Sequence, residues 1–258
     1  MKKNIKLTIE YDGSRYAGWQ RLGKDSNQTS IQGKLEYILT IMTGEKMEII
    51  GSGRTDSGVH ALGQVANFHI DTNMTPEEIK DYLNRYLPHD IAVISAAEVP
   101  ERFHSRLNAV SKTYVYHIDT RQPGNVFNRR YRKHSTPDLD IEAMRKAARY
   151  LIGRHDFKAF SSVKKSKKST LRTIYSLDIE QLEAELKITI RGNGFLYNMV
   201  RIIVGTLMDV GQGLREPAEI KTILDSQNRE LAGRTIEPEG LFLKEVEYPK
   251  EAEIIDIQ

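Results

Sequence analysis

The sequence predicts an α+β protein made of two ferredoxin-like halves, each with the element order β-α-β-β-α-β. Two observations carry this prediction. Segments of alternating apolar and polar residues, typical of half-buried strands, are interspersed with segments that have the apolar period of helices, and this series occurs twice. The 258 residues also exceed the usual length of one domain. We therefore expect domains at residues 1–105 and 106–258, mainly antiparallel sheets with helices on one face, and an active-site cleft between the halves.

Capping and turn residues mark the elements of the first half. Residues 5–11 alternate between apolar and polar side chains, which predicts a strand. Thr29 and Gln32 match a capping box and predict the start of a helix. Thr75 and Glu78 form a second capping box and predict a second helix. The other strands expected in this half cover residues 47–52, 64–71 and 90–99.

The second half repeats the same series with one addition. Its expected strands cover residues 112–118, 171–180, 185–191 and 241–248. Its expected helices cover residues 140–152 and 195–210. An extra helix is expected near residues 216–226, so the two halves are not strictly symmetric.

The composition excludes several classes of chemistry. The chain has no cysteine, which removes disulfides, thiol nucleophiles and thiolate metal sites, and which suits a reducing cytoplasm. Its longest apolar run, near residues 199–210, is interrupted by charges and is shorter than the ~20 residues of a membrane span. The N-terminus alternates polar and apolar residues, unlike a signal peptide. We expect a cytoplasmic protein without a membrane segment.

The positive charge is modest overall but clustered. The net charge is +3, and two short stretches hold many of the cations: "NRRYRKH", with Arg129, Arg130, Arg132 and Lys133 around Tyr131, and "KKSKK", with Lys164, Lys165, Lys167 and Lys168. Cations beside an aromatic ring suit contacts to nucleic-acid phosphates and bases. A solvated surface loop is the alternative interpretation of each cluster.

The stretch "GSGRTDSGVHALGQ" places one carboxylate, Asp56, beside Arg54 among glycines. Glycine lets the backbone turn sharply and approach a ligand closely. A functional loop and a hairpin turn whose amides are satisfied by Asp56 are both consistent with this pattern. A phosphate-binding loop is not, because the stretch lacks the G-x-G-x-x-G and Walker patterns.

The helix expected at residues 195–210 is apolar around nearly its whole circumference and should be buried. Arg201 lies within it, and an unpaired buried guanidinium is costly. A carboxylate from the other half is the natural partner, and Asp56 is our preferred candidate. Pairing with Asp209, two turns further along, or contact with solvent is the alternative.

The stretch "SKTYVYHI" places Tyr114 and Tyr116 on one face of a strand, either as core residues or with a ring available to stack on a base. Metal and catalytic-triad interpretations fit poorly. His60, His69 and Asp71 are close in sequence but show no H-E-x-x-H spacing, and there is no nucleophile elbow.

Taken together, five stretches resemble the TruA family of tRNA pseudouridine synthases. They are "EYDGSRYAGWQ", "GSGRTDSGVHALGQVANF", "SKTYVYHI", "GNGFLYNMVRIIVGTL" and "AGRT", and they span nearly the whole chain. The resemblance implies an isomerase that converts uridine to pseudouridine at about positions 38–40 of tRNA, in the anticodon stem-loop. It also implies a homodimer that needs no cofactor.

The resemblance also implies the roles of particular residues. Asp56 corresponds to the family's nucleophile, Arg201 to the arginine that pairs with it, and Tyr114 to the active-site tyrosine. Arg54 corresponds to the arginine that assists in extruding the target base. The basic clusters, with Arg129, Arg130, Lys164 and Lys165, are candidates for contacts to the anticodon arm.

Three positions depart from the family pattern without removing a proposed catalytic group. Ser57 stands where alanine is common, Asn198 where histidine is common, and "RTIEPEG" where a proline-rich R-T-A-P-P is common. They bear on which uridines are chosen. The rival functions are a non-catalytic RNA-binding protein of the same fold and a metal-dependent or two-carboxylate hydrolase of nucleosides. The intact R-T-D stretch argues against the first, and the lack of a second placed carboxylate argues against the other.

Overall fold

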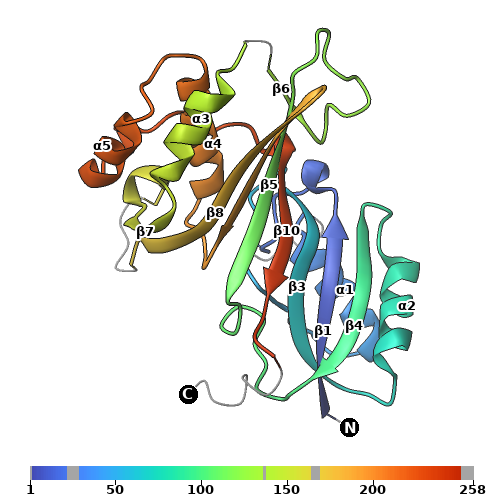
Figure 1. Cartoon of the computed structure of the whole chain (residues 1–258). Coiled ribbons are helices and arrows are strands. Elements are labelled where there is room, and N and C mark those ends of the chain that lie inside the picture. Colours follow the sequence, from blue (N-terminus) through green and yellow to red (C-terminus); the bar gives the residue numbers. More distant parts are fainter. Residues whose placement is uncertain (1, 22–28, 136–137, 164–168, 251–258) are drawn as a thin grey trace. The chain divides into compact units, whose positions relative to one another are not determined.

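The chain folds into two compact units (Figure 1). A computed structural model describes residues 2–21, 29–135, 138–163 and 169–250. The first unit consists of Met1–Val110 and Phe242–Gln258, and the second of Ser111–Leu241. The last strand therefore belongs to the first unit, whereas the sequence assigns all residues after 105 to the second domain. No helix in the described ranges combines the length and the apolar character that a bilayer span requires.

A mainly antiparallel sheet forms the first unit. Its strands are β1 (Lys2–Tyr11), β2 (Ile50–Gly51), β3 (His60–Asp71), β4 (Ile91–Val99) and β10 (Leu241–Glu247). They follow the order β4-β1-β3-β10, with β2 beside β3. Strand β10 is parallel to β3, with Phe242 opposite His60. In the centre of the sheet, Ile5 of β1 lies opposite Phe68 of β3, and both side chains are buried because they face the core.

Two helices, α1 (Ile31–Thr43) and α2 (Pro76–Tyr86), pack beside each other on one face of this sheet (Figure 1). The capping box of α2 is confirmed: Thr75 accepts from the Glu78 backbone, and the Glu78 carboxylate accepts from Thr75. The capping box expected at Thr29 is wrong, because the adjacent Ser30 accepts from the Gly33 backbone at 3.1 Å instead. The order β1-α1-β2-β3-α2-β4 is that of a ferredoxin-like unit.

The second unit contains the strand series β5-β9-β8-β7, in which each strand is antiparallel to its neighbours. Its strands are β5 (Ser111–Asp119), β6 (Lys133–His134), β7 (Gly153–Asp156), β8 (Leu171–Leu182) and β9 (Glu185–Gly192), with the short β6 parallel to β5. Its helices are α3 (Ile141–Arg149), α4 (Met199–Gly211) and α5 (Glu219–Ser226). The predicted α+β class, mainly antiparallel with helices on one face, is confirmed. The extra helix expected near residues 216–226 is also confirmed as α5, whereas the short strands β6 and β7 were not expected.

Helix α4 is the most buried helix of the second unit. Every residue from Met199 to Gly211 except Arg201 and Asp209 is buried, as the all-round apolar pattern predicts. The expected start at residue 195 is wrong, because Asn198 adopts a left-handed backbone with φ 60° and helical geometry begins only after it.

Candidate active site

Asp56 lies in the irregular segment that joins β2 to β3 in the first unit; we call residues 52–58 the Asp56 segment. The Trp19 amide donates to the Thr55 carbonyl at 3.0 Å, and the Tyr11 and Thr55 hydroxyls share a buried hydrogen bond of 2.8 Å. The Gly58 amide donates to the Tyr16 carbonyl at 3.3 Å. The segment is thus fixed to residues 11–19 immediately before and after Asp56.

The backbone of Gly18 lies so close to the Asp56 segment that no side chain fits between them. A Cβ atom on Gly18 would lie 2.5 Å from the Thr55 carbonyl oxygen and 3.1 Å from the Asp56 carbonyl carbon. Gly18 also has φ +108°, which is unfavourable for residues with a side chain. The peptide that leads to Asp56 is therefore positioned by direct contact between two backbones.

A buried polar pair holds the start of the Asp56 segment. The Ser52 hydroxyl donates to Gln64 Oε1 at 2.7 Å, and Gln64 Nε2 donates to the Gly53 carbonyl at 3.0 Å. Both side chains are buried. Since Gln64 is part of β3, this pair ties the segment to the sheet.

A turn closes the end of the segment, where the Val59 amide donates to the Asp56 carbonyl at 3.1 Å. The hairpin-turn interpretation is correct in this respect, although the bond uses the backbone of Asp56. The Asp56 side chain is partly buried and Arg54 is exposed. A partly buried carboxylate beside an exposed guanidinium combines a nucleophile with a group that can reach an RNA phosphate or base.

Arg201 is held within the second unit by two carbonyl-type acceptors. Its Nε donates to the Ile236 carbonyl at 2.7 Å, and its Nη1 donates to Asn198 Oδ1 at 3.1 Å. Asp209, the alternative partner considered from the sequence, instead pairs with Arg215 at 3.1 Å. The guanidinium thus has a defined orientation, and its pairing with Asp56 stays a prediction.

The two tyrosines of β5 have different surroundings. Tyr116 is fully buried and its hydroxyl donates to the Glu237 carbonyl at 2.7 Å. Burial, reinforced by the nearby carboxylates Glu239 and Glu237, raises the pKa of the Tyr116 hydroxyl well above its usual value. Tyr114 is almost fully buried and packs edge-to-face against Phe195, with ring centroids 5.1 Å apart. Tyr116 is a core residue, whereas Tyr114 belongs to an aromatic pair.

The first basic cluster contains partly buried and exposed cations. Arg132 forms an ion pair of 2.7 Å with Glu185, and Lys133 one of 3.2 Å with Glu237. Arg129 and Arg130 are exposed. The second cluster, with Lys164 and Lys165, lies outside the described residues. Within this first cluster, Arg129 and Arg130 are therefore the better candidates for contacts to a ligand.

The comparisons with known proteins identify the family. A model of the tRNA pseudouridine synthase family matches residues 7–108 and 147–249. The chain belongs to this family. Asp56 and Arg54 lie in the first matched segment and Arg201 in the second, whereas Tyr114, Arg129 and Arg130 lie between the two.

Curated relatives are similar over nearly their full length. A protein of Bacillus sp. (strain KSM-64) named tRNA pseudouridine synthase A is 51% identical over 95% of this chain and 99% of its own. Another, of Bacillus anthracis, named tRNA pseudouridine synthase A 2, is 46% identical over the same shares. A third, of Clostridium tetani, also named tRNA pseudouridine synthase A 2, is 45% identical over 96% of this chain and 100% of its own.

Several residues that position the candidate site in this tRNA pseudouridine synthase are not identifiable as such from sequence. Gly18 and Tyr11 touch the Asp56 segment from more than 30 residues away along the chain. His60 is buried, and its Nδ1 accepts from the Gly13 amide at 3.0 Å, so it helps to hold the same region. The one available signal is the glycine pair in "DGSRYAG", because glycine is typical of close backbone approach.

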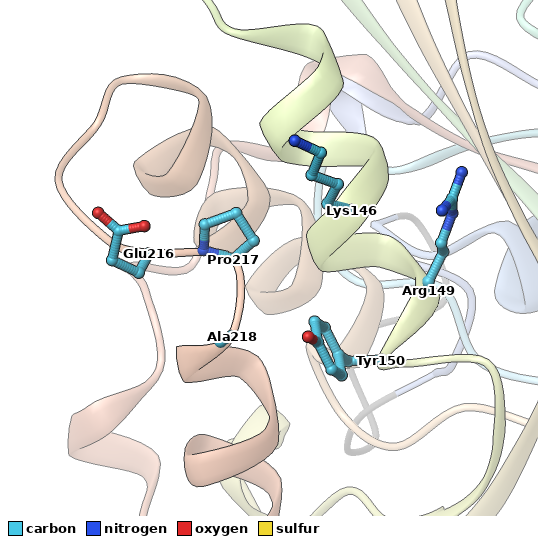
Figure 2. Close-up of a pocket in the computed structure, with 6 residues that line it drawn as sticks. All are labelled: Lys146, Arg149, Tyr150, Glu216, Pro217 and Ala218. Carbon is cyan, nitrogen blue, oxygen red and sulfur yellow. The ribbon is translucent and has the colours of Figure 1, made fainter.

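A cavity of about 320 Å³ lies elsewhere in the second unit of this family member. It is lined by Lys146, Arg149, Tyr150, Glu216, Pro217 and Ala218. In Figure 2 the Tyr150 ring faces the Pro217–Ala218 turn while the Arg149 side chain points away from it. The cavity contains no residue proposed for the reaction, and its polar groups do not converge on one point.

Proposed function

We propose that this chain isomerises uridine to pseudouridine in tRNA, at about positions 38–40 of the anticodon stem-loop, with Asp56 as the nucleophile. Membership of the family and the similarity to curated synthases over at least 95% of the chain support the reaction class. The single observation that supports the role of Asp56 is the fixed position of its segment, whose neighbouring peptides are bonded to residues 11–19 and to β3.

The reaction replaces one bond between the uracil base and its ribose with another. The bond from uracil N1 to ribose C1′ breaks, the base turns, and C5 bonds to C1′. The proton on C5 then leaves and N1 gains one, so the product is an isomer of the substrate. Asp56 attacks either uracil C6 or ribose C1′, since an aspartate with an ordinary pKa of ~3.9 is ionised at neutral pH.

The remaining groups act on binding and orientation. Arg201, oriented by the Ile236 carbonyl and Asn198, supplies a positive charge for the carboxylate. Arg54 is exposed and assists extrusion of the base, which costs a few kcal/mol in a stacked stem. Tyr114, which packs edge-to-face against Phe195, is the tyrosine that lies next to the extruded uracil in this proposal. A homodimer and a cytoplasmic location are part of the same proposal, and sedimentation tests the first.

Tritium release from tRNA labelled at uracil C5 tests the proposal. The wild-type protein should release tritium, and Asp56→Asn should lower the rate by on the order of 10⁶-fold, the scale measured for the loss of a nucleophile. Asp81→Asn, which neutralises an exposed carboxylate on α2, is the matched control and should retain full activity. Circular dichroism checks that both variants are folded.

The same reaction mixtures separate the rival functions. Isomerisation leaves the mass of the RNA unchanged, whereas a hydrolase would release free uracil. Tight binding of tRNA without tritium release from any variant would contradict the proposal and favour a non-catalytic RNA-binding protein. Full activity of Asp56→Asn would remove Asp56 from the mechanism.

A further inference from the structure

The loop between β5 and β6, residues 120–132, presents an apolar tip to solvent. Phe127 is 90% exposed and the preceding Val126 is 66% exposed. Phe127 has the largest exposed fraction among the exposed large apolar side chains of the described residues, and Val126 beside it extends the apolar surface that another molecule can contact. In Figure 1 this loop extends beyond the strands that it joins. It also lies between the two segments that the family model matches.

The base of the β5–β6 loop is organised around the buried carboxylate of Asp119. That carboxylate accepts from the Asn125 amide and from the Arg121 amide and Nε, the last two at 3.3 and 3.1 Å. Asn125 Oδ1 in turn accepts from the Phe127 amide at 3.0 Å. The exposed ring is therefore carried by a backbone that is hydrogen-bonded before any ligand binds, which lowers the ordering cost of binding.

Positive charge accompanies the tip. Arg129 folds back so that its Nη1 donates to the Val126 carbonyl at 2.6 Å, which places the guanidinium next to the Phe127 peptide. Arg130 follows and is also exposed. The cations further along, Arg132 and Lys133, are paired with carboxylates. An aromatic ring with adjacent guanidinium groups is the combination that binds a base together with its phosphates.

The size of the tip favours a nucleic-acid base over a protein surface. A stable protein interface buries about 800 Å² on each partner, far more than two side chains provide. One base, in contrast, needs only one ring on which to stack. Unpaired bases are accessible in tRNA loops but not in the interior of a duplex.

We propose that Phe127 stacks on an unpaired base of tRNA, outside the target uridine, while Arg129 contacts an adjacent phosphate. The inference rests on the proposed function in taking tRNA as the ligand. It adds a binding contact in the second unit that is separate from the Asp56 chemistry.

Equilibrium binding of unlabelled tRNA to Phe127 variants tests the proposal without depending on turnover. Phe127→Ala should weaken binding by about 5-fold to 100-fold, the range found for a lost base stack. Phe127→Leu should weaken it similarly, because it keeps apolar area but no ring, and Phe127→Trp should restore it. Tyr37→Ala, which removes an exposed aromatic ring from α1, is the matched control and should bind normally.

Three further measurements decide between explanations. A fully paired RNA duplex should bind wild type and Phe127→Ala equally, and the slope of affinity against salt should be unchanged, since Phe127 is neutral. Unchanged tRNA affinity of Phe127→Ala would overturn the proposal, as would equal weakening with the duplex. A change in oligomeric state on sedimentation would instead assign the tip to a second copy of the chain. If the wild-type protein released no tritium but the Phe127 variants bound tRNA as expected here, the result would count against the proposed function and not against the Phe127 contact.

Discussion

The Asp56 segment and the β5–β6 loop are both irregular, both carry charged residues, and are built in opposite ways. The Asp56 segment is fixed along its length: Gly18 contacts its backbone directly, and Tyr11 and Gln64 bond to it from buried positions. The β5–β6 loop is fixed mainly at its base by Asp119, and its tip at Phe127 is in solvent.

The difference follows from the tasks that we propose for the two regions. A nucleophile must reach a reacting carbon at close range, and an error of about 1 Å can cost 10²-fold in rate. A contact that only binds a flexible RNA needs exposure and charge, and tolerates small displacements. Four changes test whether the two regions differ in this way.

The largest effect is expected for Gly18→Ala. The new Cβ would lie 2.5 Å from the Thr55 carbonyl oxygen at φ +108°, so both overlap and backbone strain oppose it. We expect the free energy of unfolding to fall by about 2–5 kcal/mol. Turnover should also fall in the protein that remains folded, because the Thr55 peptide shifts and displaces Asp56. Urea unfolding and tritium release measure the two effects.

The matched control is Gly44→Ala at the end of α1. Gly44 also has a positive φ, +76°, but nothing lies within 4 Å of its Cβ position. Strain alone should therefore cost about 1–2 kcal/mol and leave turnover unchanged. Equal destabilisation by the two substitutions would show that close approach at the Asp56 segment has no energetic consequence.

The second effect concerns Asp119 and the base of the β5–β6 loop. Burial acts to raise the pKa of Asp119, but hydrogen bonds from the Asn125 and Arg121 amides, together with the Arg121 guanidinium, outweigh it and lower the pKa. Asp119→Asn weakens these charge-assisted bonds and should cost about 2 kcal/mol at neutral pH. The affinity for tRNA should fall as well, because the weakened hydrogen bonds to residue 119 no longer hold the β5–β6 loop in place.

The pH dependence has a definite sign. Because the folded pKa is lowered, the stability from ionised Asp119 is present above the unfolded value of ~3.9 and is lost as pH falls through the folded value. The difference between wild type and Asp119→Asn in urea unfolding should therefore shrink from pH ~5 downwards. A constant difference over that range would mean that the charge of Asp119 does not stabilise the fold.

Other parts of the molecule show what can be predicted from the sequence. The Thr75 capping box and the buried circumference of α4 were predictable because their signals lie within one element. The contact of Gly18 with Thr55, and the bond from Arg201 to the Ile236 carbonyl, join residues about 35 positions apart. Nothing in local periodicity encodes such a contact.

Two boundaries were wrong for local reasons. Thr29 and Ser30 are neighbouring hydroxyl residues, and pattern alone does not choose which of them caps α1. The apolar pattern of α4 continues back to Phe195, yet the left-handed backbone of Asn198 delays the helix. The candidate site was found from its motifs, whereas the contacts that fix it required the structure.

The third effect is expected for Tyr11→Phe. The substitution removes the Tyr11 hydroxyl, which forms a buried hydrogen bond of 2.8 Å with the Thr55 hydroxyl. The loss of this bond should lower the free energy of unfolding by about 1 kcal/mol. Since Thr55 precedes Asp56, we expect kcat to fall severalfold while KM for tRNA stays the same. Thr55→Val and the double variant complete the cycle. Additive effects on kcat would show that this bond does not position the nucleophile.

The smallest effect is expected within the basic cluster, where neighbouring arginines should differ. Arg132→Gln removes a partly exposed ion pair with Glu185 and should cost less than about 1 kcal/mol in unfolding free energy. Because that charge is already neutralised within the protein, the salt dependence of tRNA binding should not change. Arg129→Gln should leave stability unchanged but lower the salt slope by about 1, the value for one lost phosphate contact. Equal salt slopes for the two variants would mean that the Glu185 ion pair does not decide which arginine contacts the RNA. Arg129 at the tip would then contribute to binding in the same way as Arg132.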